Sequence, residues 1–218
     1  MALEDFTTYT ENDANNRFAV SANTIAVTAL EAEADENVGK DFGVDFFGDL
    51  PLGVEWDAEV TSQDNNAAMF VLVMTNTPEK TYKQHRVQFD NEPSFWCLFN
   101  QGGAGQREII IQTFGTIQFN DFGAYSDSTR IYFKHTRSGT TFTVKMYSDS
   151  SRTTLTDTLA ITSISTAFKH LFAVHTAYDI LATGPATTGD IKNYELLDGT
   201  LSVGGGSYFV ELQGRQVW

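Results

Sequence analysis

Short stretches in which hydrophobic and polar residues alternate recur along the whole chain, and residues typical of turns separate them. Residues 54–60 are the clearest example, because hydrophobic side chains occupy every even position and carboxylates occupy positions 55, 57 and 59. Alternation of this kind is typical of an antiparallel strand with one face in the core and the other in water. Helical periodicity is nearly absent, so the pattern predicts an all-β protein.

The other strand signals follow one another at short, regular spacing. Residues 68–76 contain an unbroken hydrophobic run, typical of a strand covered on both faces, whereas residues 28–37 predict a loop or a short helix. Together with 54–60 and 68–76, strands are predicted over residues 6–10, 17–21, 24–28, 81–90, 95–100, 107–113, 116–120, 130–137, 140–147, 155–162, 168–176, 189–196 and 207–212. We therefore expect one antiparallel, two-sheet jelly-roll β-sandwich domain that spans residues 1–218.

The charge of the chain excludes some classes of binding partner. Against 14 Lys and Arg stand 28 Asp and Glu, which gives a formal net charge of −14. A polyanion repels the phosphates of nucleic acids and of anionic lipids. The composition therefore predicts no nucleic-acid partner and no membrane partner.

Two local features bear on the compartment and on redox chemistry. The N-terminus has neither a basic segment nor a hydrophobic segment of a secretion signal, so we expect synthesis in the cytoplasm. Cys97, the one cysteine, excludes an intramolecular disulfide. Its neighbours Phe95, Trp96, Leu98 and Phe99 predict a buried, inert thiol.

Two segments resemble the concanavalin A-like lectin and glucanase jelly-roll superfamily, which includes laminin G-like domains. One is the hairpin of residues 131–149, with a turn at Ser138-Gly139, and the other is residues 188–196, which are similar to the closing strand of that superfamily. The opening at residues 6–13 also resembles small phage and metagenomic virus proteins that lack a signal.

The resemblance implies a non-catalytic protein that binds glycans or lies on a virion surface, for example as a decoration or tail-associated module. Its partners would then be a glycan or other virion or cell-surface proteins, and it could form an oligomer. A glucanase-like glycoside hydrolase is the alternative.

The hydrolase alternative depends on Glu55, Asp57 and Glu59. Carboxylates at positions i, i+2 and i+4 share one face of a strand, with the outer two Cα atoms about 6.5 to 7 Å apart. This separation suits the two carboxyl groups of a retaining glycosidase. The resemblance to laminarinase-type glucanases implies that Glu55 is the nucleophile, Asp57 a helper and Glu59 the acid/base. The other interpretation is a polar strand face in water, and the bulky Trp56 departs from the glucanase pattern.

Glycan recognition instead requires an exposed aromatic platform flanked by planar polar side chains. The candidates with these properties are Tyr82, His85, Arg86, Trp96, Arg107, Tyr125, Tyr132, His135, Arg137 and Tyr147.

A structural calcium ion is a further expectation, because members of the superfamily often hold one. The oxygen-rich candidates are Asp41, Asp45 and Asp49, spaced four residues apart, and the turn of residues 64–66. Neither matches an EF-hand loop, and both are also ordinary turn chemistry.

Overall fold

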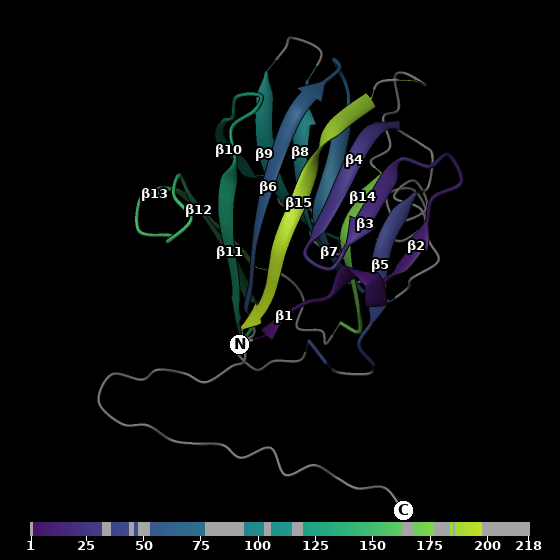
Figure 1. Ribbon diagram of the computed structural model, residues 1–218. Helices are drawn as coiled ribbons and strands as arrows, with labels where there is room; N and C mark the ends of the chain where they lie inside the picture. Colours follow the sequence, from purple (N-terminus) through teal and green to yellow (C-terminus); the bar gives the residue numbers. More distant parts are fainter. Residues whose placement is uncertain are drawn as a thin grey trace, which may run out of the picture.

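Two antiparallel β-sheets pack face to face in the computed structural model (Figure 1). The structure describes residues 2–31, 36–43, 46–47, 53–76, 94–102, 106–114, 120–162, 168–176, 184 and 186–197. The predicted strands 81–90 and 207–212 lie outside these residues, and so do residues 116–119 of the predicted strand 116–120. Among the described residues, no helix is long and hydrophobic enough to cross a membrane.

Sheet A has eight strands, in the spatial order β13-β12-β11-β6-β15-β4-β3, with β1 paired to β15. These strands are β1 (Ala2–Leu3), β3 (Phe18–Ser21), β4 (Thr24–Glu31), β6 (Gly53–Gln63), β11 (Ile131–Ser138), β12 (Thr141–Tyr147), β13 (Leu155–Thr162) and β15 (Ala186–Leu197).

Sheet B has seven strands, in the order β10-β9-β8-β7-β14-β5-β2. These strands are β2 (Thr10–Asn12), β5 (Asn37–Asp41), β7 (Ala68–Thr75), β8 (Ser94–Gln101), β9 (Arg107–Phe114), β10 (Asn120–Ala124) and β14 (His170–Thr176). The two-sheet antiparallel sandwich confirms the predicted fold class.

The core lies between the sheets and is built by the alternation seen in the sequence. Val54, Trp56, Ala58 and Val60 of β6 are all buried in it, and β7 is buried on both faces as its hydrophobic run predicted. Trp56 stacks on Phe133 of the adjacent strand β11, with ring centroids 4.9 Å apart. The buried inert thiol is also confirmed, because burial raises the pKa of Cys97.

The N-terminal third differs from the prediction, since β1 and β5 were not among the predicted strands and two further segments have another structure. Residues 6–10 are not one strand: Phe6–Thr8 form a 3₁₀ turn, and β2 begins at Thr10. The side chain of Asp5 accepts a hydrogen bond from the Thr7 backbone N–H, and this cap favours a turn over a strand. Residues 28–31 continue β4 rather than forming a loop or helix, because pairing with β15 outweighs the helix propensity of Ala and Glu.

Strand β15 carries a bulge that matters for the outer face of sheet A. Lys192 pairs with Asp57 and Glu195 pairs with Glu55, so two residues of β15, Asn193 and Tyr194, oppose the single residue Trp56. Asn193 adopts a left-handed backbone with φ of 54°. Such a bulge interrupts the ladder of backbone hydrogen bonds and re-aims a side chain.

The core also holds a polar ring with unusual surroundings. His135 of β11 is 1% exposed and packs against the rings of Phe95 and Phe142, at centroid distances of 4.9 and 5.5 Å, while these two rings stack on each other. Neither of its ring nitrogens has a hydrogen-bond partner among the described residues. Burial, with a smaller contribution from the charge of Arg137, lowers the pKa of His135 from 6.5 to about 3.

This environment predicts acid destabilisation through His135. The unfolded chain binds a proton there below about pH 6.5, whereas the folded chain does not until about pH 3, so the free energy of unfolding falls as the pH falls through this window. We expect His135→Leu to make that fall shallower and to stabilise the protein at pH 7 by about 1 kcal/mol, since two unpaired polar atoms leave the core. Urea denaturation between pH 3.5 and 7 measures both effects, and an unchanged slope would contradict this account.

Candidate functional site

The three carboxylates of β6 lie on the outer face of sheet A, as their spacing predicted. Glu55, Asp57 and Glu59 alternate with buried hydrophobic residues and therefore point away from the core. They are only slightly accessible, because 14%, 8% and 21% of their side-chain surfaces are exposed. Their low exposure results from the neighbouring side chains that form ion pairs with them.

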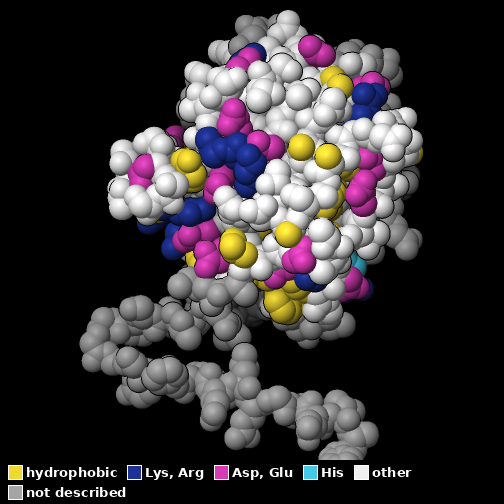
Figure 2. Space-filling model, viewed as in Figure 1, with side chains coloured by type: hydrophobic (Ala, Val, Ile, Leu, Met, Phe, Trp, Pro, Cys, Tyr) yellow, Lys and Arg dark blue, Asp and Glu magenta, His cyan; other side chains and the backbone are white. Residues whose placement is uncertain are grey.

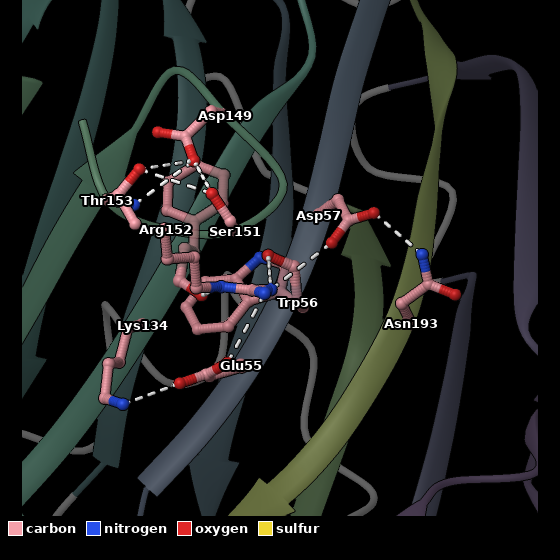
Figure 3. Close-up of polar contacts among 10 residues, drawn as sticks. Glu55, Trp56, Asp57, Lys134, Asp149, Ser151, Arg152, Thr153 and Asn193 are labelled. Atoms are coloured by element: carbon pink, nitrogen blue, oxygen red, sulfur yellow. Dashed lines mark hydrogen bonds and ion pairs between the residues drawn. The ribbon is translucent and has the colours of Figure 1, made fainter. Parts of the chain in front are cut away.

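Glu55 and Asp57 are bound by cations and an amide from three other segments (Figure 3). Lys134 of β11 lies 2.6 Å from Glu55 Oε1, and Arg152 lies 3.3 Å from Glu55 Oε2 and 3.3 Å from Asp57 Oδ1. The side-chain amide of Asn193 donates to Asp57 Oδ2 at 2.8 Å. Each oxygen of both carboxylates therefore already has a partner.

A second ionic group surrounds Glu59. Arg130 lies 3.0 Å from Glu59 and 2.7 Å from Asp190 of β15, and Lys192 lies 3.0 Å from Asp190. In the space-filling view, Lys and Arg side chains gather with Asp and Glu over the middle of the face that sheet A presents (Figure 2). The carboxylate row is thus part of a mixed-charge surface rather than an isolated acidic cluster.

The protonation of Asp57 reflects two opposed effects. Burial raises its pKa above the ordinary value, while the Asn193 hydrogen bond and the charges of Arg152 and Arg130 act in the other direction. A general acid needs a proton at neutral pH, whereas a nearby guanidinium favours the ionised form. Among the described residues, the contacts of Glu55, Asp57 and Glu59 form an ion-pair network.

Next to this network, the register of β11 and β12 creates an aromatic pair. Tyr132 lies directly opposite Tyr147, and both side chains are partly exposed on the outer face. Tyr132 also lies opposite Asp57 across the β11–β6 pair. Tyr132 thus borders the fixed polar groups of β6, and Tyr147 lies beside it one strand further away, which is the combination that sugar recognition requires.

The same register brings two like charges together. Lys134 lies directly opposite Lys145, and Lys134 is balanced by Glu55. No ion pair joins Lys145 to another residue in the described part of the chain. Like charges directly opposite in a sheet repel each other. An anionic group placed over Lys134 and Lys145 would relieve that repulsion.

The other predicted ligand contacts lie elsewhere. Trp96, Tyr125, His135 and Arg137 are 1%, 7%, 1% and 3% exposed, so they are buried and do not form an exposed platform. Arg107 is partly exposed and forms an ion pair with Asp127. The remaining three candidates, Tyr82, His85 and Arg86, lie outside the described residues.

Trp96 belongs to a second hydrophobic cluster on the outer face of sheet B. Its ring centroid lies 4.7 Å from that of Phe70 and 6.1 Å from that of His175. Burial lowers the pKa of His175 to about 4, and its Nδ1 lies 2.8 Å from the carbonyl oxygen of Thr176. The cluster consists of Phe70, Val73, Trp96, Leu98 and Phe172, and all five are buried.

The two described aspartates among the calcium candidates accept hydrogen bonds from backbone groups. Asp41 accepts from the backbone N–H of Gly43, and Asp64 accepts from that of Ala186, while Asp45 and Asp49 lie outside the described residues. Within the described ranges, no three His, Cys, Asp or Glu side chains are grouped so as to hold a metal ion. Calcium therefore stays a prediction of the resemblance alone.

Sequence reasoning missed the basic side chains and the amide of the site: Arg130, Lys134, Lys145, Arg152, Lys192 and Asn193. The predicted hairpin is present, but its two turn residues are Gly139 and Thr140 rather than Ser138 and Gly139. This difference places Lys134 opposite Lys145, whereas the predicted turn would have paired Lys134 with Thr143. Arg152 and Asn193 reach the site through a loop and a bulge, for which the alternating pattern carries no signal.

The ion pairs predict a measurable contrast between two glutamates. Glu55→Gln removes the charge that pairs with Lys134 and Arg152 at a site only 14% exposed, so we expect a loss of about 1 to 2 kcal/mol in the free energy of unfolding. The control is Glu31→Gln, which breaks the pair with Arg17 at a side chain 44% exposed and should cost less than about 0.5 kcal/mol. Equal effects in urea denaturation would show that the network contributes no more than a surface ion pair.

No protein-family model matches the sequence, and no curated protein matches it. Solved structures do share the fold. A functionally unknown protein from Saccharomyces cerevisiae has a TM-score of 0.61 at 8% identity, over 88% of this chain and 97% of that chain. An alginate lyase from Klebsiella pneumoniae has a TM-score of 0.56 at 7% identity, over 88% of this chain and 84% of that chain. An alginate lyase variant in complex with alginate tetrasaccharide has a TM-score of 0.54 at 12% identity, over 89% and 95% of the two chains. The chain is thus similar in fold to jelly-roll β-sandwich proteins.

Proposed function

We propose that the protein binds an acidic oligosaccharide on the outer face of sheet A without cleaving it. The observation that carries this proposal is the pair of opposed tyrosines, Tyr132 and Tyr147, directly beside the opposed lysines Lys134 and Lys145. Phenol rings stack on the CH faces of pyranose rings, and ammonium groups attract a carboxylate or sulfate substituent. The two pairs occupy adjacent outward-facing positions on the same two strands.

The surrounding groups supply the remaining contacts of a sugar site. Lys192 and Tyr132 both lie opposite Asp57, on the two strands that flank β6, so Lys192 adds a polar group to the same face. Ion pairs hold Asp57 and Glu55 in one conformation, so little side-chain entropy is lost when a ligand binds. The chain as a whole has a net charge of −14. The lysines beside the two tyrosines nevertheless make this part of the surface prefer an acidic oligosaccharide over a neutral one.

Alginate is the first probe because alginate lyases are among the proteins of similar fold, and one was solved with an alginate tetrasaccharide. That likeness supports a carbohydrate ligand and assigns no activity. The glucanase-like alternative, with Glu55 and Glu59 as catalytic residues, has no supporting contact. The virion-surface role, with its partner proteins, stays a prediction of the resemblance.

Binding is tested by calorimetric titration of alginate oligosaccharides and of neutral glucan oligosaccharides. We expect the acidic ligand to bind more tightly, and its affinity to fall with added salt. Tyr132→Ala should weaken binding about tenfold, since an aromatic contact contributes about 0.5 to 1.5 kcal/mol. Lys145→Gln should weaken binding of the acidic ligand and reduce its dependence on salt.

The matched control is Phe46→Ala, which removes an aromatic ring that is 45% exposed at another place on the surface. It should leave the affinity unchanged. The proposal fails if neither class of oligosaccharide binds the wild type, or if Tyr132→Ala and Phe46→Ala bind equally well.

A further inference from the structure

Hydrogen bonds within the loop that joins β12 to β13, residues 148–154, determine its conformation. Asp149 accepts hydrogen bonds from the hydroxyl of Ser151, from the backbone N–H of Thr153 at 3.2 Å and from that of Thr154 at 2.6 Å. The hydrogen bond from Ser151 and the backbone hydrogen bond from Thr154 lower the pKa of Asp149. The backbone N–H of Ser148 closes the loop by donating to the Thr154 carbonyl at 3.1 Å.

Arg152 points back from this loop onto sheet A (Figure 3). Its φ of 52° lies in the left-handed region, which costs a side-chain-bearing residue about 1 to 2 kcal/mol. Such strain persists only where surrounding contacts compensate for it. Here the compensation is extensive, because only 17% of the Arg152 side chain is exposed.

Four protein groups bind the guanidinium. Its Nε donates to the Phe133 carbonyl at 3.1 Å, one terminal nitrogen donates to the Trp56 carbonyl at 3.3 Å, and both carboxylates of the row lie 3.3 Å away. Arg152 therefore joins β11, β6 and its own loop. With its donors and charge satisfied in this way, Arg152 is a fixed structural element rather than a free anion-binding side chain.

The bulge of β15 completes this arrangement. Two residues of β15 oppose Trp56, so the regular ladder is interrupted at Trp56, whose carbonyl accepts from Arg152. The bulge also places Asn193, itself at a φ of 54°, so that its amide donates to Asp57 Oδ2. Two left-handed residues from distant segments thus converge on one carboxylate.

We propose that Arg152 is the positioning residue of the oligosaccharide site: it latches the 148–154 loop onto Glu55 and Asp57. Tyr147 directly precedes the loop and pairs with Leu155 directly after it. When the latch holds the loop against the sheet, the ring of Tyr147 keeps its place beside Tyr132. The role in binding rests on the proposed function, whereas the latch itself does not.

The latch also explains why carboxylates occur at positions 55 and 57. A retaining glycosidase needs a carboxylate free to attack the sugar. Here the four oxygens of Glu55 and Asp57 are occupied by Lys134, Arg152 and Asn193. The spacing that resembles a glucanase motif serves to hold a loop.

The experiment compares Arg152→Ala, Arg152→Lys and Arg152→Gly. Amide hydrogen exchange at Ser148, Thr153 and Thr154 reports the loop without any ligand, and titration with an alginate oligosaccharide reports the site. For Arg152→Ala we expect loop exchange faster by about tenfold or more and affinity weaker by about tenfold. Arg152→Lys keeps the positive charge, so its loop exchange rate and its affinity should both lie between those of the wild type and Arg152→Ala. Arg152→Gly relieves the backbone strain but should still lose the latch.

The control is Arg17→Ala, which removes a cation paired with Glu31 in another part of sheet A and should change neither quantity. Melting temperatures identify a variant that does not fold, and in that case Arg152→Lys decides. Loop exchange equal to the wild type in Arg152→Ala would overturn the latch. Faster loop exchange with unchanged affinity would also overturn the positioning role. If the wild type binds no oligosaccharide while the loop still loosens, the proposed function fails and the latch stands.

Discussion

The register of β11 against its two neighbours is the constraint on which the outer face of sheet A depends. It places Tyr132 opposite both Tyr147 and Asp57, and Lys134 opposite both Lys145 and Glu55. Side chains alternate between the two faces of a strand, so a slip of one residue would move every one of these groups into the core. The large buried rings of Trp56 and Phe133, stacked across the same strands, make such a slip costly. Core packing therefore determines the surface chemistry.

Much of this arrangement follows from the sequence. The alternation over residues 54–60 predicted both the strand and the outward direction of its carboxylates. The predicted Ser138-Gly139 turn located the hairpin but not its register, because the two turn residues are Gly139 and Thr140. The opening strand was predicted wrongly, because a single side-chain cap at Asp5 turns the chain there. Such local hydrogen bonds compete with strand propensity and leave little trace in a hydrophobic pattern.

The partners of the carboxylates could not be predicted in the same way. Arg152 and Asn193 lie far from Glu55 and Asp57 in sequence, and each reaches them through a left-handed residue. Periodicity reports which face a side chain occupies, but it does not report which loop folds over that face. For the same reason, a carboxylate spacing that suits a glycosidase was compatible with an ion-pair network that occupies every oxygen of Glu55 and Asp57. The buried positions of Trp96 and His135 likewise depend on packing between elements far apart in the chain.

We place the ligand-binding surface on the outer face of sheet A rather than on that of sheet B. The most direct measurement is an NMR titration of the isotope-labelled protein with an acidic oligosaccharide, in which amide shifts are mapped onto the strands. We expect the largest shifts in β11, in β12 and in the 148–154 loop, centred on Tyr132 and Tyr147. Shifts confined to the strands around Trp96 and His175, with none at Tyr132, would contradict this placement.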